Sequence, residues 1–307
     1  MRITEIREIS AGLASTMRNA VIDFSKMTLS VVAVVTDAKR DGHPIVGFGF
    51  NSNGRYSQGG VLRERLIPRL LEAETDSLLD DEGALDPFRV QACMLQNEKP
   101  GGHGERAFAV GALDAAIWDA VGKWEEKPLY KVFAERFNDG AFDTCVPVYP
   151  GGGYYDQEKG IEGLKSEMQG YLDAGYTLMK MKVGGATLEE DINRIEAALS
   201  VIGSGENLAV DANAALDIEQ ALKYAAAMAN YGLAWFEEPI DPLDFKGHAE
   251  LAAAATMPLA TAENLFSEVD ARNLIRYGGL RCDRDWLQFD PSLCYGPTTF
   301  IDIVKIT

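Results

Sequence analysis

Three acidic residues at equal spacing are the clearest chemical signal in this sequence. Asp211, Glu237 and Glu263 follow one another at intervals of 26 residues, each closes a short apolar run, and Asp290 continues the series 27 residues later. This interval suits one strand, one helix and two loops, the unit of a parallel α/β fold. In a (β/α) barrel, residues at successive strand C-termini converge on one mouth. Converging carboxylates repel one another, so we expect a divalent cation between Asp211, Glu237 and Glu263.

Two lysines precede the acidic series. Lys180 and Lys182 are separated by one residue, so on a strand both side chains project to the same face. Neighbouring ammonium groups lower each other's pKa, and a lysine with a lowered pKa can act as a base near neutral pH. Solvated lysines on an edge strand are the alternative, but this run belongs to a buried parallel set. We therefore predict that both lysines are catalytic and face the metal site.

The second part of the chain alternates strand and helix patterns. Six strands are predicted, at Cys145–Tyr149, Leu178–Val183, Leu208–Val210, Ala234–Glu237, Leu259–Ala262 and Trp286–Phe289. Helical patterns lie between them, at Gly160–Ala174, Leu188–Ile202, Ile218–Tyr231, Phe245–Ala254 and Ser267–Tyr277. This order is typical of a parallel (β/α) barrel.

The first part of the chain has a different order. Strands are predicted at Arg2–Ser10, Leu29–Thr36 and Ile45–Asn51, followed by helices at Val61–Glu72, Pro87–Gln96 and Ala107–Trp124. Asp86 is expected to cap the second helix, ahead of a proline at its first position. We therefore predict an α+β capping domain over residues 1–135 and a (β/α) barrel domain over residues 136–307.

The predicted barrel is incomplete. Only six strands fit before Thr307, whereas a complete barrel has eight and a typical length of about 250 residues. An open six-stranded barrel exposes two strand edges, which is an aggregation hazard. We therefore expect the chain to be a version of a longer protein, truncated after the sixth strand. A compact natural variant with six units is the alternative.

Composition disfavours several classes of function. The net charge of −18 argues against binding to nucleic acid or to anionic membranes, which need a positive patch. No run approaches the roughly 18 apolar residues of a membrane span, and the N-terminus has no signal-peptide core. The four cysteines lack C-x-x-C spacing and are expected to be reduced thiols. We expect a cytoplasmic protein that acts on a small molecule.

The residues above resemble a known family. The matching motifs are Lys180-Met-Lys182, Asp211-Ala-Asn213, Glu237-Glu-Pro239 and Glu263-Asn264, with Asp290 on the next strand. They resemble the enolase superfamily, in its mandelate racemase-like branch. The resemblance implies a capping domain before a modified barrel, and a Lys or His base with Mg²⁺ stabilising an ene-diolate. Four further stretches are similar to bacterial D-tartrate dehydratases: residues 18–24, 49–56, 97–106 and 283–290.

The resemblance also implies roles. Mg²⁺ held by the three carboxylates binds a substrate carboxylate and its neighbouring hydroxyl, Lys182 removes the α-proton, and Lys180 helps to hold the carboxylate. Loss of the β-hydroxyl gives an enol, which tautomerises to a 2-keto acid; D-tartrate would give oxaloacetate. The residues expected to contact the distal end of the substrate are Asn19, Asn53, Lys99 and Tyr155. For the asparagines the alternative is turn chemistry, and for Lys99 it is a solvated loop side chain.

One part of the family's pattern has no counterpart. Asp290 normally orients a histidine on the following strand, which acts as an acid or a second base, and the chain stops before that strand. His43, His103 and His248 lie in a hairpin, a glycine-rich loop and a helix, and none occupies the position. We therefore expect little dehydratase activity from this chain, with slow proton exchange by Lys182.

Three functions stay open at this point. The leading hypothesis is a Mg²⁺-dependent hydro-lyase for an acid sugar, with D-tartrate as substrate. A racemase, or a dehydratase for another acid sugar such as galactarate, would use the same lysines and carboxylates. The third is a non-catalytic fragment or pseudoenzyme that keeps the metal site. Analogy with related folds also implies a homo-oligomer.

Overall fold

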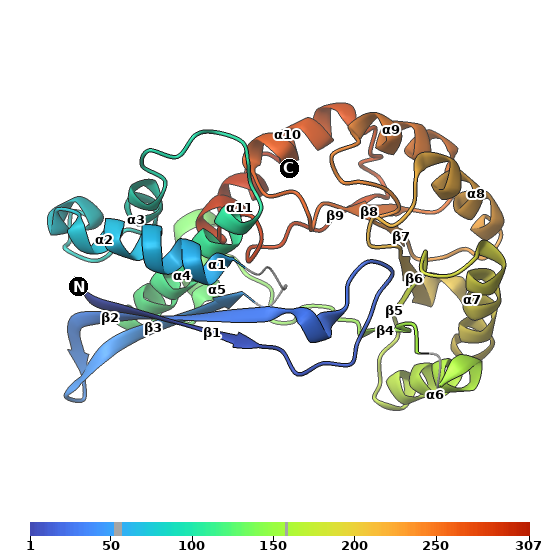
Figure 1. Ribbon diagram of the computed structural model, residues 1–307, viewed down its shortest axis with the longest axis horizontal. Helices are drawn as coiled ribbons and strands as arrows, with labels where there is room; N and C mark the ends of the chain where they lie inside the picture. The colour runs from blue at the N-terminus through green and yellow to red at the C-terminus, as the bar shows by residue number, and fades with distance from the viewer. Residues whose placement is uncertain (52–56, 157–158) are drawn as a thin grey trace.

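The chain forms two sheets of different kinds. This computed structural model describes residues 1–51, 57–156 and 159–307. Strands β1 (Ile3–Gly12), β2 (Thr28–Arg40) and β3 (His43–Asn51) form an antiparallel sheet, and six parallel strands form the second sheet in the order β4 to β9. The two sheets lie in separate lobes, here called the cap lobe and the barrel lobe (Figure 1). The predicted fold, an N-terminal α+β cap followed by an open six-stranded parallel sheet, is confirmed.

Close packing of a helix on the antiparallel sheet forms the core of the cap lobe. Helix α4 (Glu105–Trp124) is rich in alanine and lies against β3. A Cβ atom at Gly47 would lie 2.0 Å from the carbonyl oxygen of Ala116, and one at Gly49 would lie 2.1 Å from that of Ala112. Glycine is therefore required on β3, where the helix backbone approaches the strand.

Shorter helices complete the cap lobe. They are η1 (Phe24–Lys26), α1 (Gln58–Val61), η2 (Leu62–Leu66), α2 (Ile67–Glu72), η3 (Thr75–Leu78), α3 (Pro87–Met94) and α5 (Leu129–Phe137). The predicted cap of α3 is confirmed, because the Asp86 carboxylate accepts hydrogen bonds from the backbone of Phe88 and Arg89. Helix α5 was missed by the sequence prediction.

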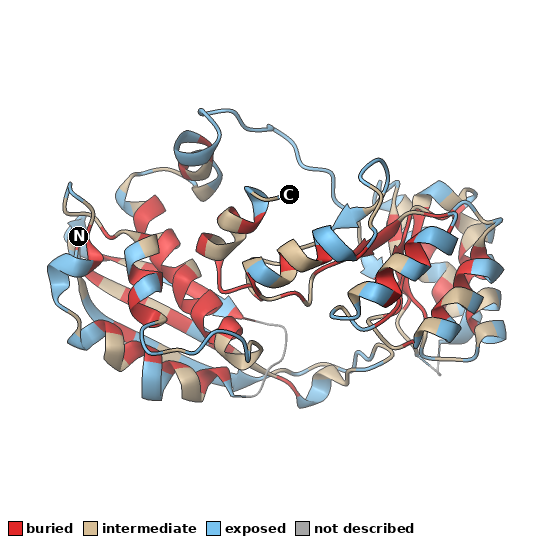
Figure 2. Cartoon of the chain, turned by 90° about the horizontal axis from the view of Figure 1, so that it is seen from above, coloured by how far each residue is buried: buried red, intermediate tan, exposed pale blue. Residues whose placement is uncertain are grey.

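The barrel lobe repeats strand and helix along the chain. Its strands are β4 (Gly151–Gly152), β5 (Met179–Lys182), β6 (Leu208–Asp211), β7 (Phe236–Glu237), β8 (Leu259–Thr261) and β9 (Trp286–Leu287). Its outer helices are α6 (Gly160–Asp173), α7 (Leu188–Ile202), α8 (Ile218–Met228), α9 (Phe245–Ala254) and α10 (Glu268–Tyr277), with a 3₁₀ turn η4 (Gly205–Asn207). Strands β5 to β8 and the inward faces of these helices are mostly buried, whereas both residues of β9 are exposed (Figure 2). In the described part of the chain, no helix is long and apolar enough to cross a membrane.

The first predicted barrel strand is wrong. Residues 145–149 form no strand, and pairing with β5 begins only at Gly151. Val146 and Val148 are 75% and 69% exposed, on the extended connection between the lobes. Apolar residues at every second position are typical of a strand, but among the described residues no strand pairs with this segment. Free thiols are found at all four cysteines, as expected.

A buried seam joins the two lobes. Helix α11 (Pro297–Val304) follows the sixth barrel strand and packs against α4. Thr298 donates to the buried carboxylate of Asp114 from its backbone nitrogen at 2.9 Å and from its hydroxyl at 2.8 Å. Trp118 donates from its indole nitrogen to the same hydroxyl at 2.9 Å. These bonds hold the end of the barrel lobe against the middle of α4.

Candidate active site

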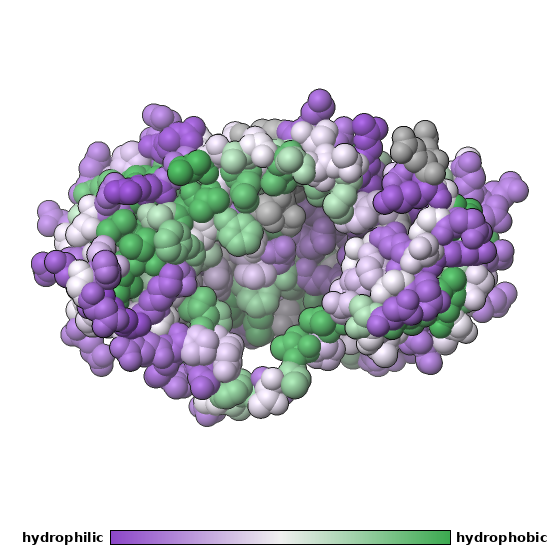
Figure 3. Space-filling model, turned by 90° about the horizontal axis from the view of Figure 1, so that it is seen from below, coloured by the Kyte–Doolittle hydropathy of each residue, from purple (hydrophilic) through white to green (hydrophobic). Residues whose placement is uncertain are grey.

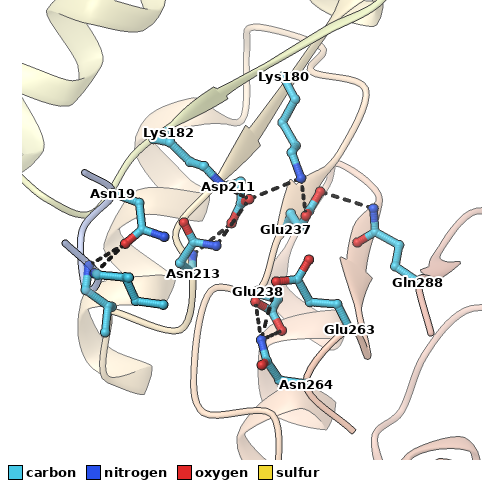
Figure 4. A network of polar contacts seen from close by, with 12 residues as sticks. Asn19, Lys180, Lys182, Asp211, Asn213, Glu237, Glu238, Glu263, Asn264 and Gln288 are labelled. Atoms are coloured by element: carbon cyan, nitrogen blue, oxygen red, sulfur yellow. Dashed lines mark hydrogen bonds and ion pairs between the residues drawn. The ribbon is translucent and has the colours of Figure 1, made fainter. Parts of the chain in front are cut away.

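Strand register brings the spaced residues together. The pairing of β5 with β6 sets Lys182 beside Asp211, and the pairing of β6 with β7 sets Asp211 beside Glu237. Glu263 follows β8, where Ala260 lies beside Glu237. Because these positions are the C-terminal ends of parallel strands, their side chains meet at one edge of the sheet (Figure 4).

Both lysines contact the same carboxylate. Lys182 Nζ lies 2.6 Å from Asp211 Oδ2, and Lys180 Nζ lies 3.2 Å from that atom. Lys180 also donates to Glu237 Oε1 at 2.5 Å. The side chains of Lys182 and Lys180 are only 9% and 14% exposed, so these ion pairs are sheltered from solvent.

The predicted lowering of the lysine pKa is wrong for Lys180. Burial favours a lower pKa, but the carboxylates of Asp211 and Glu237 outweigh it and raise the pKa of Lys180 well above its usual value. The carboxylates lie in contact with this ammonium group, which the spacing argument did not weigh. A base at this position therefore requires that the carboxylate charge be neutralised in some other way.

Glu237 is held on both of its oxygens. Its Oε2 atom accepts from the indole nitrogen of Trp235 at 2.9 Å and from the side-chain amide of Gln288 at 3.1 Å, while Oε1 accepts from Lys180. These contacts fix the orientation of the carboxylate at the centre of the site.

A second pair of carboxylates lies next to the first. Asn264 donates to both oxygens of Glu238, at 2.9 and 3.0 Å, and Glu263 lies beside them (Figure 4). Burial and the charge of Glu263 raise the pKa of Glu238 to about 8. Burial and the charge of Asp211 raise the pKa of Glu263. The raised values show that the lysines do not fully neutralise the carboxylates.

The donor types, but not their present arrangement, suit a hard divalent cation. Asp211, Glu237, Glu238 and Glu263 supply four carboxylates against two ammonium groups, an excess of two negative charges when all are ionised. The side-chain oxygen of Asn213 is buried beside Asp211 without a hydrogen-bond partner in the described structure. Yet the described residues include no group of three acidic, His or Cys side chains in metal-ligating arrangement. Lys180 lies between two of the carboxylates, so a cation would have to displace its ammonium group.

A cavity of about 750 Å³ opens beside these carboxylates. Lys182, Asn213 and Glu263 line it from the barrel lobe. Asn19, on the loop between β1 and β2, and His103, on the glycine-rich loop before α4, line it from the cap lobe. A space-filling view shows the molecule hollowed between its lobes (Figure 3). A small polar ligand in this cavity would contact both lobes.

Comparisons with known proteins identify the family. A family profile described as "Enolase C-terminal domain-like" matches residues 163–307. The 3,6-anhydro-alpha-L-galactonate cycloisomerase of Streptomyces coelicolor is 36% identical over 294 residues, which cover 96% of this chain and 74% of that protein. This chain belongs to the enolase superfamily, in its mandelate racemase-like branch.

Other superfamily relatives differ in reaction. Arabinonate dehydratase of Saccharolobus solfataricus is 34% identical over 84% of this chain and 65% of its own length. L-talarate/galactarate dehydratase of Salmonella typhimurium is 29% identical over 91% of this chain and 66% of its own length. The chain thus spans about two thirds of the length of each of these two relatives.

Solved structures of the superfamily share the fold. A racemase from Streptomyces coelicolor, crystallised with bound magnesium, has a TM-score of 0.81 and 28% identity, covering 99% of this chain and 80% of that one. An L-talarate dehydratase from Polaromonas, complexed with Mg and L-glucarate, has a TM-score of 0.76 and 27% identity, covering 99% of this chain and 77% of that one. Magnesium accompanies this fold in both structures.

The expected distal contacts lie in different places. Asn19 lines the cavity, while its side-chain oxygen accepts from the backbone of Val21 and Ile22 in a turn. Lys99 is exposed and is not among the described residues that line the cavity. Asn53 lies outside the described residues.

Tyr155 is engaged away from the cavity. Its hydroxyl donates to Asp191 at 2.7 Å and accepts from the backbone of Gly185 at 2.8 Å, and its ring lies over Arg194. Burial and the Asp191 carboxylate raise the pKa of Tyr155. The preceding residue, Tyr154, lines the cavity instead, with Lys182 Nζ 5.5 Å from its ring centre. Tyr155 is not among the described residues that line this cavity, and its expected contact with substrate stays a prediction.

The Asp290 side chain stabilises a turn in this structure. Its side chain accepts from the backbone nitrogen of Ser292 at 2.7 Å. Leu293, three residues later, lines the cavity, and Asp290 is not among the described lining residues. Its predicted catalytic role stays a prediction.

The sequence argument missed two polar residues that touch the acidic series. Glu238 follows the end of β7 with a φ of 38°, and its carboxylate is buried within the cluster. Gln288, just after β9, holds Glu237. The position of Gln288 at a strand end was the signal available in the sequence.

Proposed function

We propose that this chain is a Mg²⁺-dependent acid-sugar dehydratase that removes the proton α to a carboxylate, with D-tartrate as substrate and oxaloacetate as product. The observation that carries the proposal is the buried contact of Lys182 with Asp211 at the mouth of the barrel lobe, beside a cavity lined by both lobes. An amine base, hard oxygen ligands and a cavity for a small ligand are the parts that this reaction needs.

Asp211, Glu237 and Glu263 would hold the magnesium ion, which supplies positive charge that stabilises the ene-diolate formed when the α-proton leaves. Carboxylates that served as ligands would no longer hold the proton on Lys180, so the pKa of Lys180 would fall. Lys182 in its neutral form then accepts the α-proton, and Lys180 in its charged form holds the substrate carboxylate. Proton exchange at the α-carbon is the step that these residues support most directly.

Dehydration also requires a departing hydroxyl group. The electron pair of the ene-diolate forms the carbon–carbon double bond as the β C–O bond breaks, and the hydroxide leaves as water when it takes up the proton that Lys182 removed from the α-carbon. The enol product then moves its hydroxyl proton to carbon and becomes the 2-keto acid. The substrate is thus converted into the keto acid and water.

Two stretches that resemble D-tartrate dehydratases contribute to the cavity. Residues 18–24 supply Asn19, and residues 97–106 supply His103 with its flanking glycines. These side chains face a ligand at a distance from the carboxylate cluster and support D-tartrate as the substrate. The homo-oligomer and the cytoplasmic location expected from the sequence stay predictions.

The test is product formation with and without magnesium. D-tartrate, galactarate and arabinonate are supplied in turn, oxaloacetate is followed by a coupled malate dehydrogenase assay, and α-proton exchange is followed by NMR in D₂O. We expect α-proton exchange on D-tartrate, with slow formation of oxaloacetate, only when Mg²⁺ is present. Exchange without elimination would favour a racemase. Neither product nor exchange, with no binding of Mg²⁺, would overturn the proposal.

A further inference from the structure

A histidine and an aspartate from different lobes meet on the cavity wall. His103 comes from the glycine-rich loop before α4, and Asp270 lies in the first turn of α10. Both line the cavity that also contains Lys182 and Glu263. His103 Nε2 lies 3.7 Å from Asp270 Oδ2, slightly beyond direct hydrogen-bond distance. The proposed roles of Lys182 and the carboxylates leave this pair unused.

A relay of hydrogen bonds ends on the His103 ring. Arg106 Nε donates to the Tyr295 hydroxyl at 3.0 Å, and that hydroxyl lies 2.8 Å from His103 Nδ1, to which we assign its hydrogen. With Nδ1 as acceptor, a neutral imidazole carries its hydrogen on Nε2. Burial and the nearby Arg106 lower the pKa of His103 against the opposing effect of Asp270, which favours the neutral ring. His103 therefore presents an N–H donor on the side of Asp270.

The relay is rigidly held. Arg106 pairs with Glu98 at 3.1 Å and donates to the backbone carbonyl of Lys99 at 3.1 Å. The Glu98 carboxylate also pairs with Arg65 and Arg69, at 2.9 and 3.3 Å. A fixed ring orientation is a requirement for recognition by a single donor.

The Asp270 carboxylate can accept further hydrogen bonds. The Ser267 hydroxyl donates to its Oδ2 at 2.8 Å, and a carboxylate has about four acceptor sites. One donor and one acceptor separated by 3.7 Å match a hydroxyl group, whose oxygen can lie within about 2.8 Å of both atoms while it accepts from one and donates to the other. A carboxylate at this position would be repelled by Asp270, and a methylene would leave both groups unpaired.

We propose that His103 and Asp270 form a hydroxyl-binding subsite, which makes the enzyme selective for substrates that carry a hydroxyl beyond the α-carbon. This inference rests on the proposed function and deepens it, because it names the group that the cap lobe and the barrel lobe recognise together. His103 and Asp270 are half-buried, and a deoxy analogue gives up the hydrogen bonds that both would make to the hydroxyl, whereas an added methylene alone gives little discrimination.

The experiment compares two ligands that differ by one hydroxyl. D-tartrate and D-malate are titrated calorimetrically with Mg²⁺ present into the wild type, His103→Phe and Asp270→Asn. His43→Phe, in the exposed hairpin, and Asp302→Asn, on the surface of α11, are the matched controls. We expect the wild type and the controls to prefer D-tartrate by about a hundredfold, and the two site variants to lose most of that preference through weaker D-tartrate binding.

The outcomes separate the subsite from the proposed function. If the site variants bind both ligands more weakly by the same factor, or keep the preference for D-tartrate, then His103 and Asp270 only join the lobes and the proposed subsite is wrong. His103→Gln keeps an N–H donor and should recover part of the preference, even if His103→Phe fails to fold. If the wild type binds neither hydroxy acid and exchanges no α-proton, the proposed function fails, and the subsite fails with it.

Discussion

Lys182 Nζ and Asp211 Oδ2 lie 2.6 Å apart, although the residues are separated by 29 positions in the chain. Parallel pairing of β5 with β6 puts them in register, and the Lys182 side chain is buried where they meet. While it is paired with this carboxylate, the amine is not available to a substrate, so the proposed role of Lys182 as base requires that its contact with Asp211 be given up.

Replacement of Lys182 by alanine should abolish α-proton exchange. A positioned general base contributes about 10²- to 10⁴-fold, so a loss of that size is expected in Lys182→Ala. Lys131→Ala, at an exposed position of α5, is the matched control and should keep wild-type exchange. The rate of deuterium incorporation measured by NMR reports the result. Equal exchange in both variants would remove Lys182 from the mechanism.

Magnesium should stabilise the fold through the acidic cluster. A ligand that binds only the native state at 100 times its Kd adds about 2.7 kcal/mol to the free energy of unfolding. We expect Mg²⁺ to raise the Tm of the wild type, and to raise that of Glu263→Gln much less. Glu162→Gln, on the exposed face of α6, provides the control. A wild-type Tm that does not change when Mg²⁺ is added would contradict the metal site.

The buried carboxylate of the seam should make stability depend on pH. Burial raises the pKa of Asp114 to about 7 against the two hydrogen bonds from Thr298. The native state therefore holds a proton that the unfolded state, with a pKa of about 3.9, has released, and stability falls as pH rises from about 4 to 7. The loss is roughly 4 kcal/mol and is complete above pH 7.

Urea unfolding at several pH values checks this prediction. Asp114→Asn has no proton to lose at this position, so its free energy of unfolding should fall less than that of the wild type over the same range. Parallel curves for the two proteins would show that the seam carboxylate does not titrate in this window.

Alanine at Gly49 should destabilise the cap lobe. Its Cβ would lie 2.1 Å from the Ala112 carbonyl, so β3 and α4 would have to move apart. Overpacking of this kind costs about 1–3 kcal/mol. Gly12→Ala, at the end of β1 where a Cβ meets nothing within 4 Å, is the control. Thermal unfolding should show a lower Tm for the first variant only.

Periodicity predicted most of the barrel lobe. Asp211 and Glu237 end successive buried strands, and parallel strands with right-handed helical crossovers bring such ends to one edge. Helix α7 begins and ends at the predicted residues, Leu188 and Ile202, because a threonine cap and a following glycine mark its limits. Regular spacing and local cap chemistry are properties of the sequence itself.

The remaining features depend on contacts between distant segments. His103 follows two glycines in a loop, and nothing near it in sequence indicates that Asp270 and Tyr295 lie beside it. The raised pKa of Lys180 depends on side-chain distances to two carboxylates, which spacing along the chain does not determine. Val146 and Val148 carry a strand pattern, yet pairing requires a neighbour that local sequence cannot specify.

Helix α4 connects distant parts of the molecule. The residues leading into it carry His103, its middle is bonded to Thr298, and it lies directly on β3. Tyr295, which orients the His103 ring, lies three residues before Thr298, so the same short stretch braces both the seam and the loop. Rigid-body opening of the lobes would break buried hydrogen bonds at the seam. We therefore expect ligand entry to leave the contact between α4 and α11 intact.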